Sequence, residues 1–174
     1  GMPLDKSLRS LTSDKKRIAF IAEKTADLTG LDMFPQYLTL MFEIDALFLN
    51  NDRHLNNIAV IEHNGKFDYC PIFDNGAALL SNTMDYPMNI DAEALVRSVR
   101  ARPINTTFNR QMIHAVNLYG TQLNILRLTT SDIKRAMSEA LDYYPNRDRG
   151  IIAGRIHTTI KLRQAERMKI IGRS

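Results

Sequence analysis

The 174-residue sequence contains a single cysteine, no long apolar run and only two glycines before residue 52. Because Cys70 has no partner, a disulfide within the chain is excluded and a cysteine-based metal site is disfavoured. No apolar run reaches the roughly 18 to 20 residues that cross a bilayer, and the start lacks the charged and then apolar pattern of a secretory signal. We therefore expect a cytoplasmic protein without membrane association. Gly1 before Met2 is typical of a residue left after tag removal.

The composition predicts one globular domain over residues 1–174. With 44% hydrophobic residues, a chain of this length is long enough to bury one sizeable core and short for two. The formal net charge of +4 and the isoelectric point near 9.3 allow attraction to phosphate-rich partners such as nucleotides or nucleic acid. An excess of this size is common, so the charge alone does not identify a partner.

Six stretches have apolar residues at the spacing of an amphipathic helix. They cover residues 13–28, 35–49, 91–100, 106 or 107–119, 132–143 and 148–171. Ser13 and Gly30 suit the two ends of the first helix, and Ser131 precedes the fifth. The second helix is apolar around nearly its whole circumference, which predicts that it is buried. The last is long and strongly basic, which favours a solvated face over a nucleic-acid site.

Between the second and third helices the periodicity becomes that of β-strands. Residues 57–62 are short and β-branched, residues 66–72 alternate between polar and apolar, and Asn64-Gly65 between them is a strong two-residue hairpin signal. Pro71 must lie at a sheet edge or strand end, because it cannot donate a ladder hydrogen bond. The predicted fold class is therefore mainly α with a small β-hairpin (α+β). Its parts are a helical lead-in over 1–33, a helix, loop, hairpin and following loop over 34–89, and a helical subdomain over 90–174.

Three oxygen-bearing side chains fall at the base of the predicted hairpin. Asp52 precedes the first strand by five residues, Asn57 begins that strand, and Asp74 follows the second strand. Because the strands are antiparallel, Asn57 and Asp74 should lie at the same end of the hairpin, with Asp52 close by. Mg²⁺ binds one or two protein carboxylates, an amide oxygen, waters and phosphate oxygens, so this set predicts a site for a metal-bound phosphate. The remaining carboxylate can accept a proton from a hydroxyl.

The segment D-R-H-L-N-N, from Asp52 to Asn57, resembles the D-R-H-x-x-N catalytic loops of the HipA-like serine/threonine kinases of bacterial toxin–antitoxin systems and of phosphoinositide kinases. The later segment I-F-D-N-G is similar to the D-F-G metal motif, with Asn75 where Phe usually stands. Small size and a helical tail favour the HipA-like family. The resemblance implies a kinase-like C-lobe, with a helical bundle around a catalytic hairpin. The departure at Asn75 argues against a kinase-style in/out switch.

The resemblance also implies roles for single residues. Asp52 is the catalytic residue that orients or deprotonates the acceptor hydroxyl, while Asn57 and Asp74 bind the Mg²⁺ that bridges the phosphates of ATP. Arg53 and His54 are further nucleotide-binding candidates, and for His54 a role in bracing the loop is an equal alternative. Taken alone, an Asp in an N-N-D context most often serves as a turn or capping residue. It is the joint occurrence of the motifs that favours the kinase interpretation.

Some neighbouring residues are predicted to have structural roles only. Asp45 on the preceding helix and Asp68 on the second strand are expected to be solvated or hydrogen-bonded charges. Gly76 is expected to permit an unusual backbone angle after Asp74.

A complete kinase of this type also needs an N-terminal lobe with a phosphate-covering loop and a strand lysine. This chain has no glycine-rich loop before Asp52, and Lys15, Lys16 and Lys24 fall in a predicted helix. Two interpretations follow. The chain is a catalytic C-lobe completed by an N-lobe polypeptide, acting on a protein substrate, or it is an inactive kinase-derived module that contacts an antitoxin-like protein or DNA. Apolar surface left uncovered on the hairpin would allow a homo-oligomer.

Overall fold

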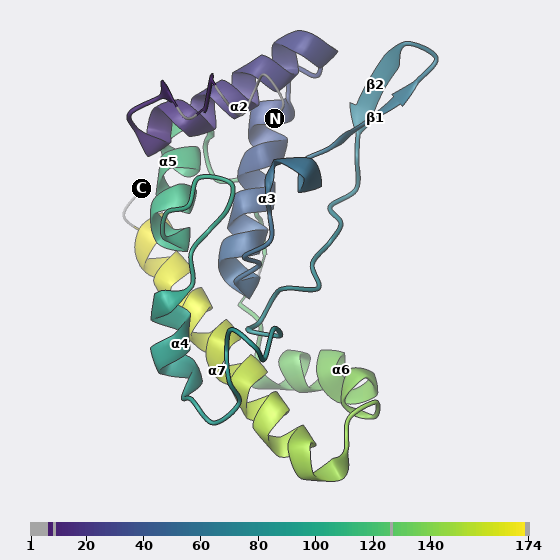
Figure 1. Ribbon diagram of the computed structural model, residues 1–174, viewed down its shortest axis with the longest axis vertical. Coiled ribbons are helices and arrows are strands. Elements are labelled where there is room, and N and C mark those ends of the chain that lie inside the picture. Colours follow the sequence, from purple (N-terminus) through teal and green to yellow (C-terminus); the bar gives the residue numbers. More distant parts are fainter. Residues whose placement is uncertain (1–6, 9, 126, 173–174) are drawn as a thin grey trace.

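The computed structural model describes residues 7–8, 10–125 and 127–172 (Figure 1). Its elements are α2 (Asp14–Thr29), α3 (Phe34–Phe48), the 3₁₀ turn η1 (Leu55–Asn57), β1 (Val60–His63), β2 (Lys66–Tyr69), α4 (Ala92–Ser98), α5 (Phe108–Tyr119), α6 (Thr130–Leu141) and α7 (Asn146–Ile171). The predicted class, mainly α with a small β-hairpin, is confirmed. Among the described residues, no helix combines the length and apolar character required to span a bilayer. The predicted helical lead-in over residues 1–33 lies partly outside the described residues.

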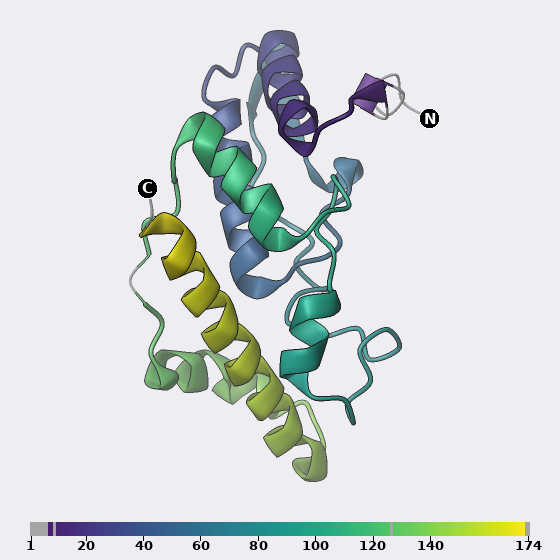
Figure 2. The same ribbon diagram turned by 90° about the vertical axis from the view of Figure 1, so that its left-hand side faces the viewer.

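Helix α3 lies at the centre of the fold and contacts α2, α5 and α7 (Figures 1 and 2). Side chains on most of its circumference are buried, as its apolar sequence predicts. Phe34, Leu38 and Phe42 belong to a core shared with α2, where Ile18 is fully buried. The helix ends at Leu49, which has a left-handed backbone with φ of 53°. This sharp end directs the chain into the motif loop that follows.

Local signals set the bounds of most helices. The Ser13 side chain accepts a hydrogen bond from the Lys16 amide, and Gly30 ends α2 with φ of 73°, both as predicted. The predicted cap of α6 is wrong by two residues. Thr129, not Ser131, caps α6, because its hydroxyl and the Asp132 carboxylate form a reciprocal capping box. The Asp132 carboxylate accepts from both the hydroxyl and the amide of Thr129, and these two hydrogen bonds lower the pKa of Asp132 below its ordinary value.

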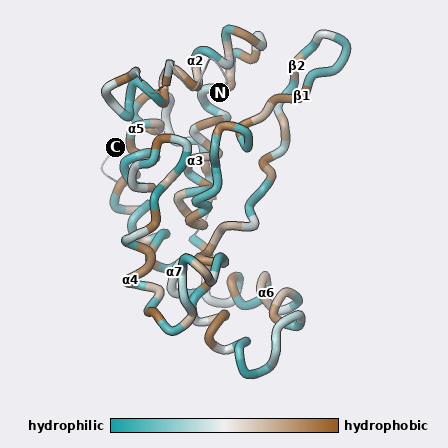
Figure 3. Tube along the Cα trace, in the orientation of Figure 1, coloured by the Kyte–Doolittle hydropathy of each residue, from teal (hydrophilic) through white to brown (hydrophobic). Residues whose placement is uncertain are grey.

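The hairpin projects away from the helices (Figure 1), and its tip is hydrophilic (Figure 3). The strands pair antiparallel, and Asn64 and Gly65 both take positive φ, the backbone of a type I′ turn. The strands are shorter than predicted, and Cys70 and Pro71 lie beyond the end of β2. In this register Ile61 and Phe67 are on opposite faces, and their exposed fractions are 45% and 38%. Exposed apolar side chains are therefore present, one on each face.

The basic residues of α7 do not form a single solvated face. The buried face has a residue at every fourth position, and three of the four are arginine: Arg155, Thr159, Arg163 and Arg167. Arg163 Nε donates to the carbonyl oxygen of Ala46 at 2.6 Å, in the last turn of α3, where helix carbonyls lack intrahelical partners. Buried arginine thus takes the place of the apolar stripe by which a packed helix is usually recognised, and the prediction of a solvated basic face is corrected for these three residues.

Candidate functional site

The structure brings the three predicted site residues together. Asn57 Nδ2 donates to the Asp74 carboxylate and to the Asp52 carbonyl oxygen, each at 2.8 Å. Asn57 is buried, whereas the Asp52 side chain is 50% exposed. Asn57 closes η1 rather than beginning a strand, so the turn, not the sheet, sets its position. The prediction that Asn57 and Asp74 lie at one end of the hairpin is confirmed.

Asp74 has a backbone that non-glycine residues seldom adopt. Its φ is 56°, in the left-handed region. Gly76, which was predicted to provide the unusual angle, is not among the residues with positive φ, so that prediction is wrong in position. Strained backbone of this kind persists only where surrounding contacts enforce it, and it concentrates at functional sites. One such contact is the hydrogen bond that the Asn50 side chain donates through Nδ2 to the Asp74 carbonyl oxygen at 3.3 Å.

Arg53 is fully buried beneath the site, and its guanidinium forms hydrogen bonds with side-chain and main-chain oxygens of the protein. Its guanidinium donates to both carboxylate oxygens of Asp45, at 2.9 and 3.0 Å, and to the carbonyl oxygens of Asn57 and Phe73. It therefore joins α3, the motif loop and the end of the hairpin. In this arrangement Arg53 positions the site, which differs from the nucleotide contact predicted for it.

Asp45, the partner of Arg53, is a hydrogen-bonded charge but not a solvated one. It is fully buried, and burial raises the pKa of its carboxyl. The hydrogen bonds and positive charge of Arg53 oppose that rise, and so does a hydrogen bond from Asn50. The ionised carboxylate at this depth thus depends on Arg53.

Two asparagines complete this buried network. Asn50 Nδ2 lies 3.1 Å from Asp45 Oδ1 and 3.3 Å from Asn75 Oδ1, and Asn75 Oδ1 also accepts from Arg53 at 2.9 Å. The network accounts for asparagine at position 75, where a D-F-G motif has phenylalanine. Sequence reasoning missed the role of Asn50, since an asparagine after a helix is usually read as a turn residue.

His54 lies beside Asp52 on the open side of the site. Its side chain is 42% exposed, and its Nε2 is 3.9 Å from Asp52 Oδ1, beyond hydrogen-bonding distance. The main chain of the loop is fixed independently, because the His54 amide donates to the Asp52 carbonyl oxygen at 2.8 Å. Both roles of the His54 side chain, contact with phosphate and bracing of the loop, stay predictions.

The donor set at the base of the hairpin fits a hard divalent cation. Within the described ranges, no three His, Cys, Asp or Glu side chains gather as a metal-binding group. The site instead offers a carboxylate from Asp74, which accepts a hydrogen bond from Asn57 Nδ2, and the side-chain amide oxygen of the same asparagine. Mg²⁺ is typically held by one or two such protein oxygens and completed by waters and phosphate oxygens. Asn57 and Asp74 are therefore the residues that would hold it.

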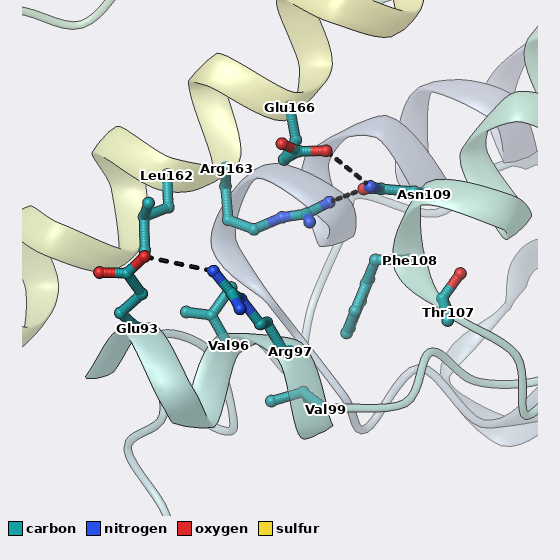
Figure 4. Close-up of a pocket in the computed structure, with 10 residues that line it drawn as sticks. All are labelled: Glu93, Val96, Arg97, Val99, Thr107, Phe108, Asn109, Leu162, Arg163 and Glu166. Carbon is teal, nitrogen blue, oxygen red and sulfur yellow. Dashed lines mark hydrogen bonds and ion pairs between the residues drawn. The ribbon is translucent and has the colours of Figure 1, made fainter. Parts of the chain in front are cut away.

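Two cavities are each lined by four charged residues, and of these two only one is lined by a motif residue, Asp52. The first, of about 460 Å³, lies between α4, α5 and α7 (Figure 4). Its charged groups are already paired: Arg97 with Glu93, and Arg163 with Asn109, which also binds Glu166. Burial lowers the pKa of Arg163 to about 10. The second cavity, of about 480 Å³, is lined by Asp52 and by polar residues of the following loops. It is the one that belongs to the candidate site.

Arg155 holds the loop that forms one wall of this second cavity. Its guanidinium donates to the carbonyl oxygens of Tyr86 at 2.7 Å and Pro87 at 2.6 Å, with longer contacts to Leu80 and Ile90. Burial lowers the pKa of Arg155. Sequence analysis placed this segment correctly as a loop, but it had no means of locating the residue that orders it.

Replacing Arg155 with leucine should loosen this loop. Charge-assisted hydrogen bonds contribute about 1.5 to 3 kcal/mol each, so cleavage within residues 79–90 should accelerate about tenfold or more. Limited proteolysis followed by mass spectrometry would locate and time the cuts. Arg147→Leu, on the exposed start of the same helix, is the matched control. Equal cleavage rates in the two variants would contradict the role given to Arg155.

Comparisons of the chain with protein-family models, with curated proteins and with solved structures found no match. The sequence motifs and the geometry of the site are therefore the observations that support a function.

Proposed function

We propose that this chain carries the catalytic half of a phosphotransferase similar to the HipA-like serine/threonine kinases, and that it requires an N-lobe from elsewhere for activity. The observation that carries the proposal is the pair of hydrogen bonds from Asn57, one to Asp74 and one to the backbone of Asp52. They join the two motifs on which the resemblance depends. The buried Arg53–Asp45 pair beneath them supplies the rigidity that a preorganised site needs.

In this proposal Asp52 acts on the acceptor. Its half-exposed carboxylate takes the proton of a serine or threonine hydroxyl as the hydroxyl oxygen bonds to the terminal phosphorus of ATP. The bond from that phosphorus to the bridging oxygen breaks, and ADP leaves. Mg²⁺ held by Asn57 and Asp74 would neutralise charge on the phosphates. Arg53 and Asn50 keep Asp74 in its left-handed backbone, so that the carboxylate faces Asn57.

The proposed need for an N-lobe is supported by the described residues ahead of the motif. Among the described residues before Asp52, the secondary structure is helical, and no strand lysine or phosphate-covering loop is present. The hairpin extends from the helices without a covering element (Figure 1). Exposed Ile61, Phe67 and Phe73 offer apolar contacts for an N-lobe or a second copy.

The same features support the alternative, a kinase-derived module that no longer catalyses and instead binds an antitoxin-like partner. An uncovered site is what such a module would retain. DNA is less well supported as the partner, because Arg155, Arg163 and Arg167 point inward and leave the last helix with fewer exposed charges than its sequence suggests.

Nucleotide titration separates these two functions. We expect the protein to bind Mg²⁺-ATP weakly, because half of the phosphate contacts are absent, and we expect Asp74→Ala to abolish this binding. Amide signals from the motif loop, followed by nuclear magnetic resonance, would report it, and Mn²⁺ in place of Mg²⁺ would broaden those nearest the metal. Asp68→Ala, on the exposed strand β2, is the matched control. Signals that respond equally in both variants would argue against the metal site, and tight binding by the chain alone would overturn the inferred need for an N-lobe.

A further inference from the structure

The cavity beside Asp52 has the form of an open polar cleft. One wall is the loop that follows the D-N-G motif, which contributes Asn82, Asp85 and Tyr86. The other wall is the chain after α4, which contributes Arg100 and Arg102. Because Asp52 lines the same cleft, a group bound there would lie next to the carboxylate that we assign to the acceptor hydroxyl. The cleft is therefore on the acceptor side of the site.

The two arginines of the cleft are exposed and have no carboxylate partner. Neither forms an ion pair with any described residue. Among the described residues, their one side-chain hydrogen bond runs from Arg100 to the Asn105 carbonyl oxygen at 3.2 Å. Most other exposed arginines of the described chain, such as Arg97 and Arg110, are paired with a carboxylate. A guanidinium presents a planar fork of donors that matches a carboxylate or phosphate.

The backbone that carries these arginines is fixed. Ala101 between them is fully buried, and it forms a β-bridge with Thr106 through a 2.7 Å hydrogen bond. The carbonyl oxygen of Arg102 accepts from the buried Gln111 side chain at 2.9 Å. Arg100 and Arg102 stand on either side of the anchored Ala101, and both line the cleft. Their side chains are thus free while their positions are set.

The opposite wall is fixed as well. The Asn51 amide donates to the Tyr86 hydroxyl at 2.7 Å, and Arg155 holds the loop carbonyls from below. Asp85 is already engaged, since Asn82 donates to its carboxylate at 2.8 Å. With Asp52 and Asp85 in its lining, the cleft would repel a chain of phosphates such as a nucleic-acid backbone. A peptide with a single acidic side chain avoids that repulsion.

We propose that this cleft binds the acceptor as an acidic peptide segment, in which a carboxylate near the accepting serine or threonine is held by Arg100 and Arg102. The asparagine side chains of the cleft supply donors and acceptors for the peptide backbone. This inference rests on the proposed phosphotransferase function, because the bound peptide is the phosphoryl acceptor only if the protein transfers a phosphoryl group. The binding itself does not depend on nucleotide.

The proposal is tested with a pair of fluorescein-labelled peptides that contain one serine and differ only in having glutamate or glutamine beside it. Fluorescence anisotropy with the full chain at low salt should show binding of the acidic peptide about tenfold tighter, a difference typical of one charge-assisted contact. Arg100→Ala/Arg102→Ala should remove that preference. Arg97→Ala, a nearby exposed arginine outside the cleft, should keep it. No preference in the natural chain, or an equal loss in Arg97→Ala, would overturn the proposal.

Two further measurements distinguish a carboxylate from a phosphate ligand, and the cleft assignment from the proposed function. Free glutamate should displace the acidic peptide at lower concentration than inorganic phosphate does, and the reverse order would overturn the assignment of a carboxylate. Asp74→Ala should bind the acidic peptide normally even though it loses Mg²⁺-ATP. If Asp74→Ala binds nucleotide as well as the natural chain does, the proposed function fails while the cleft assignment stands. If the double arginine variant keeps its peptide preference, the cleft assignment fails and the proposed function stands.

Discussion

Replacing Arg53 with alanine should lower the free energy of unfolding by about 3 to 5 kcal/mol, the range measured when one partner of a buried ion pair is removed. Asp45 would be left as a buried carboxylate without its two guanidinium bonds. The carbonyl oxygens of Asn57 and Phe73 would lose a donor as well. Urea unfolding followed by circular dichroism measures this loss. Arg110→Ala removes the exposed partner of the partly buried Asp14, which keeps Arg17, so it should cost about 0 to 1 kcal/mol and is the matched control.

The pH dependence of the Arg53→Ala variant distinguishes a stranded charge from a simple loss of packing. Burial raises the pKa of Asp45, and Arg53 is among the groups that oppose the rise, so the variant should raise that pKa further. A folded-state pKa above the unfolded value means that the folded protein binds more protons, and its stability then falls as the pH rises. The deficit relative to the natural chain should therefore shrink as the pH is lowered toward the pKa of the stranded carboxyl. A deficit independent of pH would contradict this account.

A double variant, Asp45→Leu/Arg53→Met, tests how much of the loss comes from the uncompensated charge. Replacing both members of a buried pair by apolar residues is often close to neutral. Here recovery should be partial, because the carbonyl oxygens that Arg53 serves would still lack donors. Mg²⁺-ATP binding should not return in the double variant, since the contacts that hold Asp74 beside Asn57 would be gone. Full recovery of both properties would show that Arg53 has no part in positioning the site.

Signals that act over a few residues predicted the fold well. Asn64-Gly65 predicted the position of the hairpin turn, because both residues accept the positive φ that the turn requires. Ser13 and Gly30 marked the ends of α2 for similar local reasons. The error at α6 has the same origin. Thr129 and Ser131 are both good caps, but only Thr129 has an acidic residue three positions later, Asp132, which is the sequence signal of a capping box.

The candidate site was predictable in its outer members and not in its support. Asp52, Asn57 and Asp74 follow from motif spacing, because antiparallel pairing brings Asn57 and Asp74 to one end of the hairpin. The motif resemblance makes Arg53 a nucleotide-binding candidate, and only the structure shows its burial against Asp45.

The arginines of α7 raise the same difficulty. Hydropathy treats Arg155, Arg163 and Arg167 as solvent-facing, yet each is buried and donates to main-chain carbonyl oxygens of other segments. A basic helix can therefore be internal when long side chains reach polar groups on facing elements. Net charge counted from the sequence then overstates the charge that is exposed to a partner.

Glu43 is a second buried charge on α3, and its loss should have an effect as large as that of Arg53. It is fully buried, and its carboxylate accepts from the amides of Gln122 and Leu123 at 2.7 and 2.8 Å and from the Thr121 hydroxyl at 2.6 Å. Arg167 of α7 approaches the same carboxylate at 3.3 Å. Glu43 therefore joins α3, the chain after α5, and α7, which is a role that no local sequence pattern reveals.

Glu43→Ala should destabilise the protein by about 3 to 5 kcal/mol, because it leaves the Arg167 charge without a carboxylate and two backbone amides without an acceptor. Glu93→Ala, which breaks an exposed pair on α4, should cost about 0 to 1 kcal/mol and serves as the control. Combining Glu43→Ala with Arg167→Met should cost less than the sum of the two single losses, since the double variant strands no charge. Urea unfolding of the natural chain, the two single variants and the double variant provides the double-mutant cycle. Strict additivity would mean that Glu43 acts through the amides of Gln122 and Leu123 alone, and that its proximity to Arg167 contributes nothing to stability.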